Sequence, residues 1–429
     1  MAAETTPPMA VADAEGLPGS PLHLREGSEH CVSLTDLEAQ WLRSTYGRHL
    51  DLLRHGKRGA WALRAGRICG IITLPGGRRI YIEPRVPVRN VWTLLWLAGE
   101  VDCIAPPAAV AETFAGLADG MMELFVTEVA RLIGSGVASG YNHVERVLPC
   151  VRGRLDLQRQ LRELPHRLDR FACRFSELSR DTLENRVLAA ALELVVRAAG
   201  GDLSLRARAA WCLRTLSSTV ATRPLKAGEI AAARAGLAQR QYRVPLALAR
   251  LLLEGLGVSH RPAGHLRGPA TPTLLVEMPR LFERVVCRSL QQNLPLPLRA
   301  SSGGHSRALD ESGHALLSPD ALIEGPDGPI CVVDAKYKPD SGTRREPSAD
   351  DTYQMLAYCI GYGVRHAVLV YPRAVDAPPL RINSGSFNAT IHTLGLDLSA
   401  DARSIKPEAA RLAAQVAELL AEGAQVLPR

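Results

Sequence analysis

The sequence predicts an α/β protein of several domains, with a small β-rich domain first, a helical region next and an α/β domain last. The first observation is length, because 429 residues exceed one ordinary domain. The second is composition, since 46% hydrophobic and 22% charged residues allow a sizeable core. The third is a change of apolar periodicity along the chain. The predicted parts are a disordered tail (1–25), a β-rich domain (26–100), a helical region (101–265) and an α/β domain (266–429).

The β-rich domain is predicted from short alternating runs that begin at Trp61. Strand-like segments cover 62–64, 69–74 and 79–83, glycines stand at the turns between them, and Pro84 ends the last segment. The tail before this domain holds four prolines and has no cationic start followed by an apolar run. It therefore predicts disorder and no signal peptide.

Helical spacing of apolar residues dominates the centre of the chain. The helices that this spacing predicts cover 92–96, 121–133, 182–198, 207–216 and 246–256. Residues 257–272 contain three prolines and three glycines, which indicates a boundary. Helices and strands mix beyond it, and the predicted order is a helix (278–290), a hairpin turning at 325–328, a helix (352–360), a strand (367–371) and an amphipathic helix (406–421).

Several classes of protein are excluded by composition and motif. No window approaches the roughly 18 uncharged apolar residues of a membrane span. The nine cysteines form no CxxC pair, which argues against a zinc site or a disulfide framework and indicates a cytoplasmic protein. A GxxxxGK[ST] loop is absent, so we expect this chain to bind no nucleotide itself.

Positive charge is unevenly distributed, both by residue type and along the chain. The chain has 46 arginines and only five lysines, and its net charge is +7. Residues 1–265 carry 34 basic and 26 acidic side chains, whereas residues 266–429 carry 17 and 18. If nucleic acid is a partner, its long-range attraction therefore comes mostly from the N-terminal part. An arginine-rich surface without a partner remains the alternative.

The segment that predicts chemistry is the hairpin in the C-terminal domain. If it folds about Asp327, Asp320 falls opposite Asp334, and cross-strand neighbours lie about 5 Å apart. Two carboxylates at that distance repel each other unless one is protonated or a divalent cation lies between them. Lys336 projects from the same strand face as Asp334, where its ammonium group can assist a water molecule or neutralise a phosphate.

Surface clusters of two acids and a lysine are common, so a solvated turn is the competing interpretation of this hairpin. Two features favour chemistry. The apolar pair Val332-Val333 leads directly into Asp334, which predicts that the charges lie at the end of a buried strand. Lys336 is also one of only five lysines in a chain that otherwise uses arginine.

The arrangement Pro319-Asp320, thirteen residues, then Asp334-Ala335-Lys336 resembles the motif of the PD-(D/E)xK nuclease superfamily. Glu283 stands in the preceding helix, where that superfamily often has an acidic metal ligand; an ordinary solvated glutamate is the alternative. Gln354 and Tyr358 match the QxxxY motif of its RecB-like branch and share one helical face, although an amphipathic helix with polar edges also gives this pattern.

Five further segments extend the resemblance over roughly residues 58–375. In chain order they are GRICGII (66–72), IYIEPRVP (80–87), VRGRLD (151–156), FSELSRDTLENR (175–186) and MPRLFE (278–283). Together with the nuclease motif they are similar to the McrC family, the nuclease subunit of McrBC-type modification-dependent restriction systems. The chain departs from that family at Arg85, where lysine is usual, and at Pro279, where asparagine is usual.

The resemblance implies a restriction-endonuclease-like C-terminal domain that cuts double-stranded DNA carrying modified bases. It implies Mg²⁺, with Mn²⁺ as a substitute, held by Asp320, Asp334, the Ala335 carbonyl and Glu283, with Lys336 as the third catalytic residue. It also implies a partner, a McrB-like AAA+ GTPase ring, which the β-rich N-terminal domain docks on and stimulates. Two alternatives remain open: an adaptor that activates the ring without cutting DNA, and a RecB-like repair nuclease.

Overall fold

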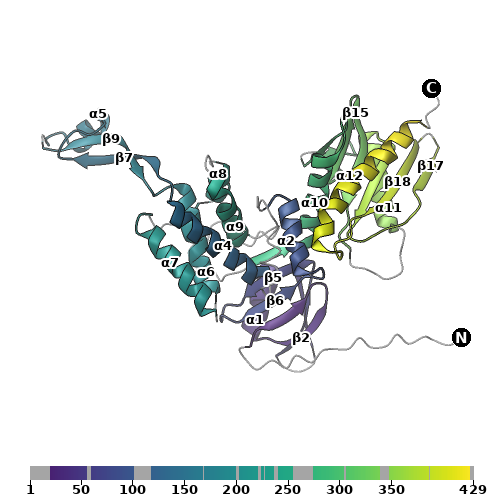
Figure 1. Cartoon of the computed structure of the whole chain (residues 1–429), viewed down its shortest axis with the longest axis horizontal. Coiled ribbons are helices and arrows are strands. Elements are labelled where there is room, and N and C mark those ends of the chain that lie inside the picture. Colours follow the sequence, from purple (N-terminus) through teal and green to yellow (C-terminus); the bar gives the residue numbers. More distant parts are fainter. Residues whose placement is uncertain are drawn as a thin grey trace. The chain divides into compact units, whose positions relative to one another are not determined.

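The computed structural model describes residues 20–55, 59–100, 117–167, 169–199, 202–220, 224–226, 228–235, 240–254, 274–303, 306–338, 347–385 and 387–425 (Figure 1). The chain forms two compact units. Among the described residues, the first unit holds those up to Gly120 and those from 274 onward, and the second holds Met121–Glu254. The predicted α/β architecture of several parts is confirmed. None of the described helices is long and apolar enough to cross a membrane.

The first unit begins with two small sheets around one apolar core, to which Leu63, Ile72 and Ile80 contribute. The four-stranded sheet has the order β1 (Leu22–Arg25), β6 (Arg79–Glu83), β5 (Ile68–Thr73) and β10 (Leu274–Glu277). The three-stranded sheet has the order β2 (Glu29–Ser33), β4 (Ala60–Ala65) and β3 (Leu50–Arg54). Helices α1 (Asp36–Tyr46) and α2 (Val88–Leu97) complete this part, and a Thr35–Glu38 capping box begins α1.

Two of the predicted boundaries differ from the structure. Leu22–Arg25 is a strand, so the prediction of a disordered tail is wrong there, and residues 1–19 lie outside the described part. Strand β10 follows the predicted boundary at 265/266, yet it pairs with β5 of the four-stranded sheet, hereafter the N-terminal sheet. A four-residue strand has too little sequence to reveal a partner about 200 positions away. The proline- and glycine-rich segment 257–272 lies outside the described residues.

Four of the five predicted central helices are confirmed in the second unit, and the fifth (92–96) is α2 of the first unit; the second unit also contains a sheet that was not predicted. Its helices are α4 (Leu117–Ser135, which starts in the first unit), α6 (Leu183–Ala198), α7 (Leu203–Ser217), α8 (Glu229–Ala235) and α9 (Arg243–Glu254). Between α4 and α6, strands β7 (Gly140–Leu148) and β9 (Phe171–Ser179) form a ribbon, with β8 (Arg154–Leu155) and α5 (Leu157–Glu163) at its end (Figure 1). Most side chains of β7 are exposed or half-buried, so no apolar alternation marks this strand.

The segment VRGRLD contains the whole of the short strand β8 and the N-cap of α5. Gly153 has φ +68°, and a Cβ there would come within 2.5 Å of the Arg174 carbonyl oxygen, so glycine is required. Asp156 accepts a hydrogen bond from the Arg159 amide at 3.1 Å and pairs with the Arg174 guanidinium at 2.7 Å. The roles that the structure shows for this segment are therefore structural.

The C-terminal part of the first unit is a six-stranded mixed sheet with helices packed against it. The strand order is β11 (Arg299–Ser302), β14 (Ala321–Gly325), β15 (Gly328–Ala335), β16 (His366–Tyr371), β18 (Phe387–Gly395) and β17 (Leu380–Ser384). Helix α11 (Ala349–Tyr362) packs its Met355 and Cys359 against Val332 and Leu369 of this sheet. Helix α10 (Met278–Asn293) contacts β15 and also packs against α12 (Ala402–Gln425). Strand β15 therefore lies inside the domain, and its carboxyl end positions the candidate site.

Candidate active site at the end of strand β15

The hairpin β14–β15 brings the two predicted aspartates together. Its register pairs Ala321 with Val333, and one step further in the same register places Asp320 opposite Asp334. The register contains an irregularity between Ile323 and Glu324, which the simple fold about residue 327 did not include. The turn pairs Gly325 with Gly328, and the bulge then shifts the register by one residue. Asp320 therefore still falls opposite Asp334, as predicted.

Asp320 is held from two directions. Its Oδ2 accepts a hydrogen bond from the Ala335 amide at 2.7 Å, and its carbonyl oxygen accepts one from the Cys287 thiol of α10 at 3.3 Å. Burial, and then the Asp334 carboxylate, raise the pKa of Asp320 to about 7. The carboxyl group that the sequence singled out therefore lies where a negative charge is electrostatically costly.

Asp334 is 3% exposed, and its environment is also unfavourable for a bare negative charge. Burial raises the pKa of Asp334, and the adjacent Lys336 ammonium only partly offsets this effect. The Lys336 Nζ lies 2.5 Å from Asp334 Oδ2, although that buried oxygen accepts no well-aligned hydrogen bond. One lysine thus partly balances one buried and one half-buried carboxylate.

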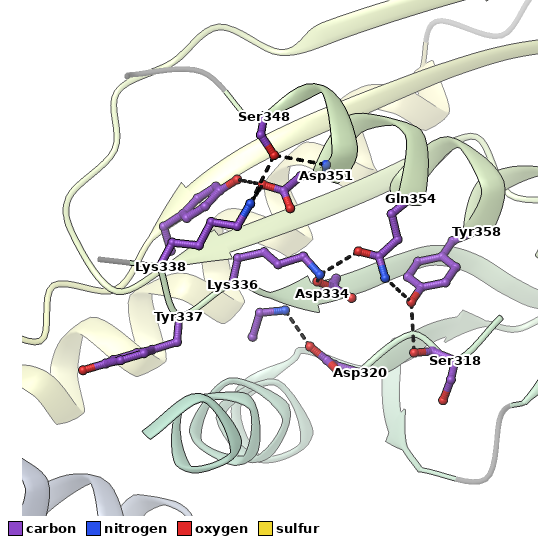
Figure 2. A network of polar contacts seen from close by, with 12 residues as sticks. Ser318, Asp320, Asp334, Lys336, Tyr337, Lys338, Ser348, Asp351, Gln354 and Tyr358 are labelled. Atoms are coloured by element: carbon purple, nitrogen blue, oxygen red, sulfur yellow. Dashed lines mark hydrogen bonds and ion pairs between the residues drawn. The ribbon is translucent and has the colours of Figure 1, made fainter. Parts of the chain in front are cut away.

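The QxxxY residues of α11 connect this lysine to Ser318, two residues before Asp320. Lys336 Nζ donates a hydrogen bond to Gln354 Oε1 at 2.7 Å, and Gln354 Nε2 donates to Tyr358 Oη at 2.8 Å. Tyr358 Oη in turn donates to the Ser318 carbonyl oxygen at 3.1 Å (Figure 2). The i, i+4 spacing noted in the sequence therefore places both side chains in one chain of hydrogen bonds.

Glu283 is the third of the predicted acidic residues and lies on α10. It is half-buried on α10, one turn before Cys287, whose thiol contacts Asp320. Burial raises the pKa of Glu283, Arg280 opposes this effect, and the negative charge of Asp334 adds to it. Glu283 therefore shares the electrostatic field of the aspartate pair, on the side of the site formed by α10.

The donors at this site suit a hard divalent cation. Within the described part of the chain, no group of three or more histidine, cysteine, aspartate or glutamate side chains is arranged to hold a metal. Mg²⁺, however, is commonly bound by one or two carboxylates, with water and substrate phosphates completing its shell. A buried carboxylate with a poorly satisfied oxygen (Asp334) and a half-buried one (Asp320), both with raised pKa values, match that pattern.

A second polar cluster lies beside the site, and the sequence analysis did not single it out. Lys338 Nζ lies 2.5 Å from Asp351 Oδ2 and donates a hydrogen bond to Ser348 Oγ at 3.1 Å, and Tyr371 Oη donates to the same Asp351 oxygen at 2.9 Å (Figure 2). Burial opposes ionisation, but these donors hold the pKa of Asp351 below its ordinary value. The scarcity of lysine that marked Lys336 would also have marked Lys338.

Comparison with known proteins adds the family. The family model for McrBC 5-methylcytosine restriction system components matches residues 63–372, which is more than half of the chain. The chain belongs to this McrBC family. The resemblance to the McrC family is therefore confirmed, and the site at the end of β15 lies within the matched residues.

Two relatives illustrate how far this McrBC family member resembles others. It is 22% identical over 329 residues to the type IV methyl-directed restriction enzyme EcoKMcrBC of Escherichia coli (strain K12), covering 73% of this chain and 94% of the relative. It also matches a chain in a half-complex of Thermococcus gammatolerans McrB AAA+ hexamers with bound McrC, with a TM-score of 0.61. That match has 18% identity and covers 92% of this chain and all of the other, which shows a shared fold.

Proposed function

We propose that this McrBC component is a Mg²⁺-dependent DNA endonuclease subunit of a modification-dependent restriction system, and that its C-terminal domain is a PD-(D/E)xK nuclease domain. The observation that carries the proposal is the position of the Lys336 ammonium. The ammonium group contacts both Asp334 and Gln354, and the other aspartate of the site, Asp320, has a raised pKa. A buried, charge-strained cluster of this kind is expected at a catalytic site more than at a structural one.

Each residue has a role in this proposal. Asp320 and Asp334 would hold the cation, with the Ala335 carbonyl and Glu283 as further ligands. When bound, Mg²⁺ would polarise a phosphoryl oxygen and neutralise charge that develops during hydrolysis. Lys336 would orient the attacking water and stabilise negative charge on the phosphate, while Gln354 and Tyr358 keep its side chain extended toward the site.

The proposal includes a partner and a substrate. The archaeal assembly is described as McrB AAA+ hexamers with bound McrC, and the bacterial relative as methyl-directed. By analogy we propose that this chain works with a McrB-like AAA+ GTPase ring on double-stranded DNA with modified bases, in the cytoplasm. The chain has no GxxxxGK[ST] loop, which supports a division in which the partner binds the nucleotide.

The test is reconstitution of the chain with its AAA+ GTPase partner. With GTP and Mg²⁺, we expect cleavage of DNA that contains methylcytosine, little cleavage of unmodified DNA, and none after chelation of the metal. Stimulated GTP hydrolysis without cleavage in either Mg²⁺ or Mn²⁺ would instead support an adaptor. Cleavage that needs neither the partner nor modified bases would support a repair nuclease.

Replacing Tyr358 by phenylalanine tests the hydrogen-bond chain behind the lysine. The change removes the hydroxyl that joins Gln354 to the Ser318 carbonyl and leaves the aromatic ring in the core. We expect the cleavage rate to fall about three- to tenfold, because one hydrogen bond contributes about 1 kcal/mol.

Tyr353→Phe is the matched control for this prediction. Tyr353 lies on the same helix but is 69% exposed, so its hydroxyl is solvated. Rates are to be compared at saturating Mg²⁺ in the reconstituted complex. Equal cleavage by both variants would show that the QxxxY pair does not support Lys336.

A further inference from the structure

The residue that follows the active-site lysine connects the site to the N-terminal sheet. Tyr337 is 6% exposed, and its ring packs against Phe282 of α10 at 6.1 Å between centroids. Its carbonyl oxygen accepts a hydrogen bond at 2.9 Å from the guanidinium of Arg67, which lies between β4 and β5. Both partners come from elements far from Tyr337 in the sequence.

The Tyr337 hydroxyl contacts a buried glutamate, Glu26, which has no role in the proposed chemistry. Tyr337 Oη donates to Glu26 Oε2 at 3.2 Å, and the Arg85 amide donates to the same oxygen at 3.1 Å. Glu26 follows β1, is 1% exposed, and its carbonyl oxygen accepts a hydrogen bond from Arg85 Nε at 2.9 Å. Burial raises the pKa of Glu26, and the Arg85 and Tyr337 hydrogen bonds oppose this effect. An ionisable group buried this deeply costs stability, so a role is expected.

These contacts hold the backbone on both sides of the Lys336 side chain. The Lys336 amide donates to the Val370 carbonyl of β16 at 2.8 Å, while the next residue is held by Arg67 and Glu26. The Arg67 carbonyl also accepts the Met278 amide at 3.0 Å, at the start of the helix that carries Glu283. Arg67, in the turn between β4 and β5, thus contacts both the residue after Lys336 and the first residue of α10. Because chemistry needs groups placed within a fraction of an ångström, such support affects rate.

We propose that Glu26 and Tyr337 are positioning residues for DNA cleavage, through which the N-terminal sheet holds Lys336 toward Asp334. The N-terminal sheet then completes the nuclease site instead of being an independent module. This inference rests on the proposed nuclease function and deepens it.

The test uses the complete complex with three substitutions. Tyr337→Phe removes the donor, and Glu26→Leu removes the acceptor. Glu26→Gln keeps an oxygen that can accept both hydrogen bonds. We expect Tyr337→Phe and Glu26→Leu to lower kcat for cleavage about tenfold with KM for DNA unchanged, because both side chains are buried away from the surface that a substrate can contact. We expect Glu26→Gln to retain near-normal cleavage, and the Tyr337→Phe/Glu26→Leu pair to lose little more than either single variant.

Tyr242→Phe provides the matched control for general loss of stability. Tyr242 is also a buried tyrosine whose hydroxyl donates to a side chain, Asn185 Oδ1 at 2.8 Å, but it belongs to the second unit. The inference is overturned if Tyr337→Phe cleaves at the wild-type rate, or if Tyr242→Phe loses as much kcat at an equal shift in melting temperature. If the wild-type complex does not cleave DNA, the proposed function fails and the inference with it. Failure of the inference alone leaves wild-type cleavage intact.

Discussion

Asp334→Asn and Lys336→Ala are each expected to lower the cleavage rate at least about 100-fold in the complex with the AAA+ partner. The first change removes a buried carboxylate from the proposed cation site, and the second removes the ammonium group 2.5 Å from it. Both variants should still stimulate the GTPase activity of the partner, because the changes are confined to the end of β15. Single-turnover cleavage of methylated DNA and steady-state GTP hydrolysis measure the two activities separately.

Two variants in the same domain control for loss of charge. Asp327→Asn changes an exposed carboxylate in the turn of the same hairpin, and Lys406→Ala changes a lysine of α12 whose ammonium lies over the Trp96 ring. Both are expected to cleave at near wild-type rates. If the Asp334→Asn and Lys336→Ala variants both cleave DNA at the wild-type rate, this site is not the nuclease active site.

Without divalent metal, the contribution of Asp320 to the free energy of unfolding is expected to fall as pH rises from about 4 to about 7. The pKa of Asp320 is raised from 3.8 to about 7 in the folded protein by burial and by Asp334. Between these values the folded state binds more protons than the unfolded state, so each rise in pH favours unfolding. The stabilising contribution of Asp320 is fully present below its unfolded-state pKa of 3.8. It is lost as pH rises through its folded-state pKa of about 7. Its size is on the order of 4 kcal/mol.

Asp320→Asn isolates this contribution from the titration of the rest of the chain. The asparagine side-chain oxygen can still accept the Ala335 amide, while the titrating charge is gone. In metal-free urea unfolding at pH 7 the variant should be more stable than wild type, and the difference should shrink toward pH 4. Added Mg²⁺ should stabilise the wild type much more than the variant. Equal stability of the two proteins at both pH values would exclude a strained carboxylate pair.

Stability gained by removing a catalytic charge is the expected signature of a functional site. A structural ion pair behaves in the opposite way, because loss of one partner leaves the other buried and uncompensated. The Lys338–Asp351 pair provides that contrast, since the pKa of Asp351 is lowered where that of Asp320 is raised. Measuring Lys338→Met beside Asp320→Asn therefore distinguishes structural from functional charge within one domain.

Several features could be predicted because their causes are local. A turn between two apolar runs defines the β14–β15 hairpin, and the period of two in a strand places Asp334 and Lys336 on one face. The i, i+4 spacing places Gln354 and Tyr358 together on α11. The scarcity of lysine in the composition singled out Lys336, and the structure places that ammonium group beside Asp334.

Other features had no local signal. Strand β7 has no buried face and no apolar alternation, so the ribbon of the second unit was predicted as part of a helical region. Strand β1 is four residues long and stands in a segment rich in proline. Its parallel partner β6 is more than 50 positions away, and short strands gain their stability from such partners more than from their own residues.

Local sequence was thus sufficient to place two aspartates and a lysine at one end of one hairpin, because strand alternation and turn formation depend on neighbouring residues. It could not show that Glu26 meets Tyr337 across 311 positions, or that Arg67 supports the residue after the lysine. Those contacts exist because burial of the N-terminal sheet against the C-terminal part brings distant polar groups into a space without water. There each must find a hydrogen-bond partner, and folding of the whole unit selects which one.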